Sequence, residues 1–103
     1  MKENAYQGKL IKKIKERFPG CEVLKNDANY IQGVPDLTVL YKDKWAMLEC
    51  KKQADSSLRP NQAYYISKFD SMSFSRLIYP ENEEEVLNEL ERSFKTRRST
   101  RSV

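Results

Sequence analysis

Residues 34–52 read VPDLTVLYKDKWAMLECKK. Two runs of strand-forming residues flank the polar triplet KDK: DLTVLY at 36–41 and WAMLEC at 45–50. This is the sequence form of a β-hairpin. Charge falls at the ends of the two runs, because Asp36 opens the first while Glu49 and Lys51 close the second. Buried strand ends rarely carry charge without a cause, so the hairpin predicts both the centre of a sheet and a candidate site.

The register of this hairpin decides which charged side chains meet. Strand side chains alternate between faces, so Glu49 and Lys51 share one face. A two-residue loop at Asp43-Lys44 would place Asp36 opposite Lys51 and bring all three groups to that face. A three-residue loop would send Asp36 to the opposite face. The first register is the one that predicts a functional constellation.

Local patterns around the hairpin predict the other elements. Apolar residues at helical spacing predict helices over 4–18, 60–70 and 82–94, and strand-forming runs predict strands at 21–24 and 74–79. Asn82 is the expected N-cap of the last helix, and the acidic run 81–85 is expected to be its solvated start. The order α-β-β-β-α-β-α predicts one α/β domain over 1–94, a small mixed sheet flanked by helices. Residues 95–103 are expected to form a disordered basic tail.

Composition narrows the possible chemistry. The 103 residues include no histidine, which removes the commonest general base and every zinc site that needs imidazole. Cys21 and Cys50 form no CxxC pair and are expected to be reduced and structural. The net charge of +4 makes a polyanionic partner plausible. Without a membrane-length apolar run, a signal peptide or a dinucleotide or P-loop fingerprint, we expect a cytoplasmic protein with no membrane and no small-molecule cofactor.

The charged residues of the hairpin predict a metal site. Two converging carboxylates are costly unless a cation lies between them, and oxygen ligands suit Mg²⁺ or Mn²⁺. Asp36 and Glu49 are the expected ligands, and the backbone carbonyl of Cys50 is a further potential ligand. Lys51 would orient or deprotonate a water molecule and offset charge on a phosphate. The constellation predicts phosphodiester hydrolysis without histidine.

These residues also resemble a known family. Val34-Pro35-Asp36, twelve further residues and then Glu49-Cys50-Lys51 resemble the PD-(D/E)XK nuclease motif, and the predicted element order resembles the core of that superfamily. The phrase GVPDLTVL…WAMLECKK…LRPNQAYYI is similar to phage and bacterial VRR-NUC (virus-type replication-repair nuclease) domains, and the plan is close to that of Holliday-junction resolvases. The resemblance covers residues 3 to about 90. It implies a Mg²⁺- or Mn²⁺-dependent DNA endonuclease.

The resemblance implies two supporting residues and an assembly. Glu3 heads the inward stripe of the first helix and would be a metal ligand, as the first-helix acid is in the family. Gln62 of the second helix would position substrate or water. A homodimer acting on branched DNA is implied, with Tyr64, Tyr65 and Phe94 as candidates for its interface. Five basic residues are candidates for contacts with DNA: Lys9, Lys12, Lys13, Lys52 and Arg59.

Each candidate has a purely structural alternative. Asp36 could be a turn acid after a proline, and Glu49 with Lys51 a cross-strand ion pair. Glu3 could be an acid favoured by the helix dipole, and Gln62 a solvated helix residue. At the level of function, the alternatives are a non-catalytic nucleic-acid-binding module that retains a nuclease fold, a homing or nicking-type duplex endonuclease, and a nuclease acting on RNA.

Overall fold

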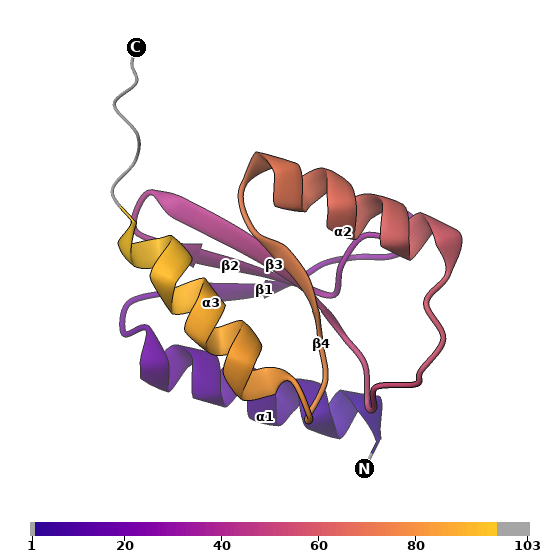
Figure 1. Cartoon of the computed structure of the whole chain (residues 1–103), viewed down its shortest axis with the longest axis horizontal. Coiled ribbons are helices and arrows are strands. Elements are labelled where there is room, and N and C mark those ends of the chain that lie inside the picture. The colour runs from indigo at the N-terminus through magenta and orange to yellow at the C-terminus, as the bar shows by residue number, and fades with distance from the viewer. Residues whose placement is uncertain (1, 97–103) are drawn as a thin grey trace.

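The computed structural model describes residues 2–96 and contains the elements in the predicted order (Figure 1). They are α1 (Glu3–Arg17), β1 (Glu22–Lys25), β2 (Leu37–Tyr41), β3 (Lys44–Cys50), α2 (Pro60–Met72), β4 (Ser75–Ile78) and α3 (Glu83–Lys95). The sequence pattern placed every element correctly, and the boundaries differ by at most two residues. The chain is therefore a small α/β protein with a four-stranded mixed sheet and three helices.

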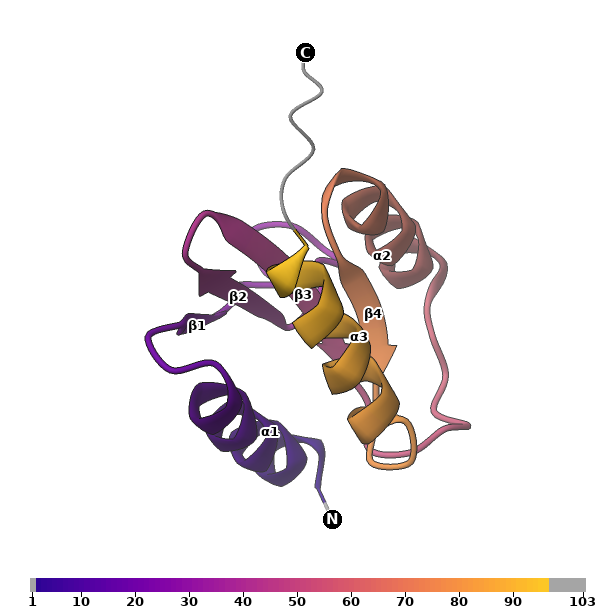
Figure 2. The same cartoon turned by 60° about the vertical axis from the view of Figure 1, so that its left-hand side comes forward.

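The sheet has the strand order β1-β2-β3-β4, with antiparallel pairs except for the parallel pair β3 and β4. α1 and α3 cover one face of the sheet and α2 lies against the other (Figure 2). The core fills the space between the sheet and α1 and α3, where Leu10, Val39, Leu48 and Leu90 are fully buried. All residues of α2 retain partial exposure, and this helix packs on β3 and β4. The half of the sheet formed by β1 and β2 is thus less covered on the α2 side.

The hairpin register differs in detail from the prediction. Leu37 pairs with Leu48, so the loop is Lys42-Asp43, one residue earlier than expected, and Lys42 has a positive φ of 57°. When a two-residue loop moves by one position, each residue of β2 pairs with a residue of β3 two positions away from the expected one. Because side chains alternate with a period of two, every side chain stays on its expected face. Extending the pairing by one step places Asp36 opposite Glu49, not opposite Lys51. The prediction of a shared face was correct, but the predicted partner was wrong.

The segment entering β2 is held tightly against α2. Gly33 has a φ of +94°, a conformation that favours glycine, and a Cβ added there would lie 2.8 Å from Cγ of Asn61. Asn26 donates a backbone hydrogen bond to the carbonyl of Asp36 (2.8 Å), and its side-chain nitrogen donates to the carbonyl of Pro35 (2.8 Å). These contacts fix the backbone on which Asp36 is carried.

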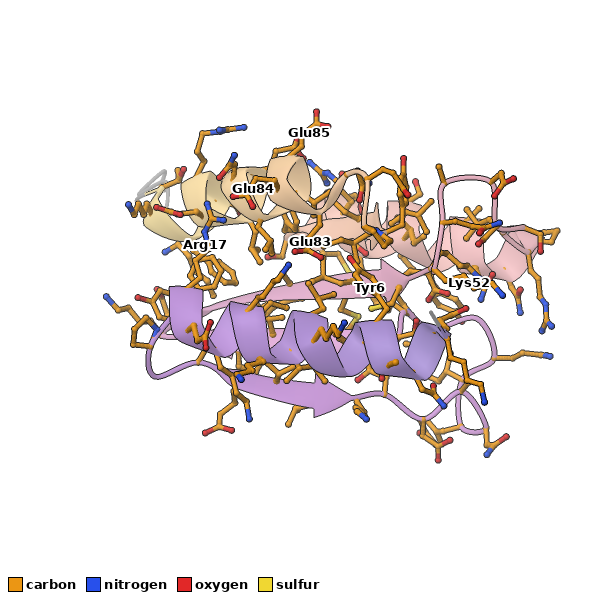
Figure 3. All side chains as sticks on the ribbon, turned by 90° about the horizontal axis from the view of Figure 1, so that it is seen from below. Tyr6, Arg17, Lys52, Glu83, Glu84 and Glu85 are labelled. Carbon is orange, nitrogen blue, oxygen red and sulfur yellow. The ribbon has the colours of Figure 1, made fainter. Side chains whose placement is uncertain are left out.

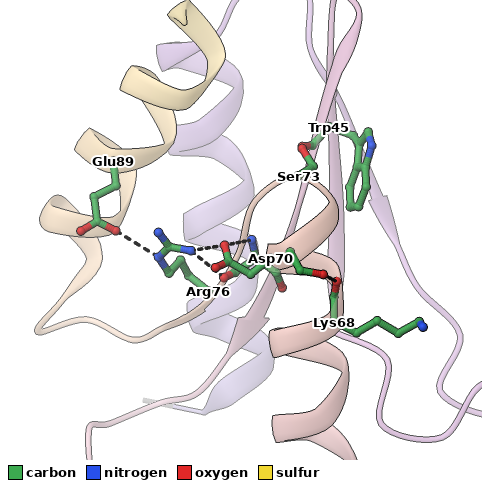
Figure 4. A network of polar contacts seen from close by, with 8 residues as sticks. Trp45, Lys68, Asp70, Ser73, Arg76 and Glu89 are labelled. Atoms are coloured by element: carbon green, nitrogen blue, oxygen red, sulfur yellow. Dashed lines mark hydrogen bonds and ion pairs between the residues drawn. The ribbon is translucent and has the colours of Figure 1, made fainter. Parts of the chain in front are cut away.

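β4 is anchored between the two helical layers by Arg76. Nε of Arg76 donates to Glu89 of α3 (3.1 Å), and its guanidinium also pairs with Asp70 of α2 (Figure 4). The Asp70 carboxylate accepts the backbone N–H of Ser75 as well (3.1 Å). A single cation therefore joins α2, β4 and α3 at the sheet edge.

The C-terminal end of α3 corrects two expectations. Phe94 is buried and packs against Phe18 and Tyr41, so it is part of the core and is not available for a dimer interface. Lys95 is the last residue of α3 and pairs with Glu91, although it was predicted to begin the tail. The rest of the predicted tail beyond Thr96 lies outside the described residues. Over the described part of the chain, no helix is long and apolar enough to cross a membrane.

Candidate active site

The charged ends of the hairpin converge on the α2 side of the sheet. Glu49 is 2% exposed, and its Oε2 lies 3.5 Å from Nζ of Lys51, which is 12% exposed. Asp36 is half-buried, and its Oδ2 accepts the backbone N–H of Cys50 (2.9 Å). The start of β2 lies beside the end of β3, so Asp36 meets Glu49 and Lys51 at the open end of the hairpin.

Gln62 connects this end of the sheet to the start of α2. Its Nε2 donates to Oε2 of Glu49 (3.0 Å), while its Oε1 accepts from the backbone N–H of Arg59 (2.9 Å) and from Nζ of Lys51 (3.4 Å). The first of these two acceptor contacts caps the helix, since the amides of a first turn have no partner within the helix. The structure thus brings Gln62 together with the predicted site, and its solvated-helix alternative does not describe it.

The carboxylates lie in an environment that disfavours their charge. Burial, and then the charge of Asp36, raises the pKa of Glu49 from 4.5 to about 7. The pKa of Asp36 is also raised, chiefly by burial, and the charge of Glu3 adds to the effect. Oε1 of Glu49 is buried without a hydrogen-bond partner among residues 2–96. A buried acceptor that is left unpaired costs free energy until a cation or a donor reaches it.

This donor set fits a hard divalent cation in part. The unpaired Oε1 of Glu49 and the carboxylate of Asp36 are oxygen ligands of the kind that Mg²⁺ and Mn²⁺ bind. Burial raises the pKa of the Cys50 thiol, which stays neutral and offers no thiolate ligand. Within the described residues, no three acidic, histidine or cysteine side chains are arranged to hold a metal. Glu3 influences both carboxylates by its charge but does not complete such a group.

A polar groove of about 270 Å³ reaches Asp36. It is lined by Asp36 and Gln62, by Arg59 and Asn61 at the start of α2, and by the segment before β2. Arg59, an expected DNA contact, therefore lies beside the site. An anion that entered this groove would meet the exposed guanidinium of Arg59, and the ammonium of Lys51 contacts Gln62 of the lining.

The remaining basic candidates lie in different surroundings. Lys9 and Lys12 are exposed on α1, which covers the opposite face of the sheet from α2. Lys52 is exposed immediately after β3 (Figure 3). Lys13 pairs with Glu83 at 2.6 Å, so much of its charge is already neutralised within the protein. Lys52 and Arg59 are the members of the set nearest to the candidate site in the chain.

One buried polar cluster was missed from the sequence. Glu83 is 7% exposed and accepts hydrogen bonds from the hydroxyl of Tyr6 (3.0 Å) and from Nζ of Lys13 (2.6 Å), which joins α1 to α3 (Figure 3). The expectation that the whole acidic run was solvated is therefore wrong for Glu83. Its partners lie 77 and 70 residues away in the chain, and no local pattern marks such a pairing. Because Tyr6 is one turn from Glu3, the cluster also fixes the end of α1 that carries Glu3.

Comparison of the chain with protein-family models, with curated proteins and with solved structures gave no match. The functional argument therefore depends on the residues and geometry of the site.

Proposed function

We propose that the protein is a divalent-metal-dependent DNA endonuclease of the PD-(D/E)XK type. The observation that carries the proposal is the meeting of Asp36, Glu49, Lys51 and Gln62 at one end of a hairpin, with an unpaired carboxylate oxygen among them. The ion pair of Glu49 with Lys51 would not by itself require a second buried carboxylate. Clusters of buried titratable groups with shifted pKa values beside a groove are typical of active sites.

Asp36 and Glu49 would hold the cation, together with the backbone carbonyl of Cys50. Mg²⁺ or Mn²⁺ bound there would act as a Lewis acid on a phosphate oxygen and lower the pKa of water. With a cation present, the carboxylates would be ionised at neutral pH, because an adjacent positive charge offsets their burial. Glu3 would add negative charge at the edge of the site rather than serve as a principal ligand.

Lys51 and Gln62 would act directly on the reacting groups. The ammonium of Lys51 is held by Glu49 and Gln62, so it is oriented before substrate arrives. It can donate to a non-bridging phosphate oxygen, where negative charge grows as water attacks phosphorus and the ester P–O bond breaks. The Gln62 side chain is fixed by the backbone of Arg59 and can align the water. An immobile amide at this position loses little entropy during the reaction.

The implied homodimer has a candidate surface away from the core. Leu24 and Leu40 are 48% and 40% exposed on neighbouring strands, and Tyr64 is 57% exposed on α2. Sedimentation equilibrium of the wild type and of Leu40→Glu tests this part of the proposal. We expect a dimer that the charged variant converts to a monomer, and a wild-type monomer would contradict it.

The test of activity is cleavage of labelled four-way junction, nicked duplex, intact duplex and single-stranded DNA with Mg²⁺, Mn²⁺ or EDTA. We expect metal-dependent cutting that Asp36→Ala and Lys51→Ala each reduce by at least about a hundredfold. Lys15→Ala, which removes an exposed lysine of α1, is the matched control and should cut normally. Tight binding of DNA without cleavage of any substrate would favour the non-catalytic binding module instead.

A further inference from the structure

A second groove, of about 450 Å³, opens beside the candidate active site. It lies between α2 and the segment that joins β1 to β2, which run close to each other in Figures 1 and 2. Met47, Phe69, Ile31 and Val34 give it an apolar lining, and Tyr30 forms part of its wall. Val34 also lines the polar groove that contains Asp36. The two grooves are therefore neighbours on either side of Val34.

Both walls of this groove are fixed in place. The close approach of Gly33 to Asn61 joins the segment to α2, as described above. Oδ1 of Asn26 accepts the hydroxyl of Thr38 (2.9 Å), which joins the start of the segment to the sheet. A groove with fixed walls loses little conformational entropy when a ligand enters it.

The lining of the groove fits a flat aromatic ring with polar edges. Tyr30 is 85% exposed, although burial of its ring would be favourable in water, and Phe69 lies on the α2 side of the same groove. Asn26 and Asp27 also line the groove and supply polar side chains that could pair with the edge of such a ring. Stacking of bases on aromatic side chains is one of the ways in which proteins hold unpaired nucleic-acid strands.

We infer that this groove receives an unstacked nucleobase of the DNA strand whose backbone passes the active site. The inference rests on the proposed function and names its substrate class: DNA with an unpaired base near the cleaved bond, as in single strands and branch points. A base within an intact duplex would first have to leave its stack, so duplex should bind more weakly. Tyr30 is then a specificity-determining residue that has no part in the hydrolysis itself.

The test measures DNA binding in EDTA, where cleavage cannot interfere. Fluorescence anisotropy compares a labelled single-stranded oligodeoxynucleotide with its duplex, for the wild type, Tyr30→Ala and Tyr30→Phe. We expect Tyr30→Ala to weaken single-strand binding by about tenfold and duplex binding by less than about twofold, while Tyr30→Phe retains the preference because its ring still stacks. Met72→Ala removes another exposed apolar side chain of α2, outside the groove, and serves as the control.

Three results would overturn the inference. The first is equal affinity of the wild type for the single strand and the duplex, and the second is equal weakening of both by Tyr30→Ala. The third is a wild-type dimer that Tyr30→Ala dissociates while single-strand affinity stays unchanged. The last result would make the groove an interface between copies of the chain. Parallel cleavage assays in Mg²⁺ separate this failure from failure of the proposed function. Metal-dependent cutting without a role for Tyr30 would contradict only the base pocket and leave the nuclease proposal standing. Tyr30-dependent binding without any cutting would contradict only the nuclease proposal.

Discussion

Replacing Glu49 with glutamine should stabilise the metal-free protein at alkaline pH. The folded structure raises the pKa of this carboxyl from 4.5 to about 7, so folding disfavours its charged form. Each pKa unit corresponds to about 1.36 kcal/mol, which gives a cost of roughly 3 kcal/mol once the group is ionised. The stability that the neutral carboxyl contributes is fully present below 4.5, its pKa in the unfolded chain, and is lost as the pH rises through about 7, its pKa in the folded chain.

Glutamine keeps the shape of the side chain and an oxygen that can accept from Gln62, but it cannot ionise. Urea unfolding in EDTA should therefore show a wild type that loses roughly 3 kcal/mol relative to Glu49→Gln between about pH 4 and about pH 8.5. Glu85→Gln, at an exposed position of α3, should follow the wild-type pH profile. Parallel profiles for the wild type and Glu49→Gln would refute the argument that burial opposes this charge.

The same variant also tests the proposed metal site through stability rather than activity. A cation that binds only the folded state stabilises it by about 2.7 kcal/mol at a hundred times its dissociation constant. Mn²⁺ should therefore raise the midpoint of wild-type unfolding near pH 8 and have little effect on Glu49→Gln. An equal increase in both proteins would place the bound cation elsewhere.

Three further predictions concern the residues around the site. Gln62→Ala should lower kcat by about tenfold or more in steady-state cleavage, with a smaller change in KM, because it removes an aligning amide. It should also destabilise the protein by about 1 kcal/mol in urea unfolding, because the helix cap is lost. Tyr6→Phe should cost about 1 kcal/mol by removing the hydrogen bond to Glu83. Burial raises the pKa of Tyr6, so above about pH 10 the unfolded chain ionises this tyrosine more readily than the folded chain, and wild-type stability falls. Urea titrations of Tyr6→Phe should not show this part of the decline, because phenylalanine cannot ionise. Gly33→Ala should lower the free energy of unfolding by about 1 kcal/mol or more beyond the loss in Gly20→Ala, as measured by thermal unfolding. Both glycines have a positive φ, but only a Cβ at position 33 would lie against α2. Equal losses would mean that this contact is not constrained.

Local sequence patterns determined the elements of this protein. The triplet between two strand-forming runs predicted the hairpin, and apolar spacing predicted all three helices, because these signals depend on neighbours within a few residues. The shared face of Asp36 and Glu49 also followed from the alternation of strand side chains. That prediction was correct despite a misplaced loop, since a two-residue loop preserves the face wherever it falls.

Tertiary structure alone decided how distant charges and rings are used. Glu83 is buried against Tyr6 and Phe94 packs on Phe18; the spacing along α3 places both on its apolar face but does not reveal these partners. The family resemblance pointed to Gln62, but its bonds to Glu49 and Lys51, like the groove beside Tyr30, are formed only in the folded chain. These arrangements depend on how whole helices and segments pack against the sheet. That packing is a property of the complete set of apolar contacts, so no short stretch of sequence encodes it.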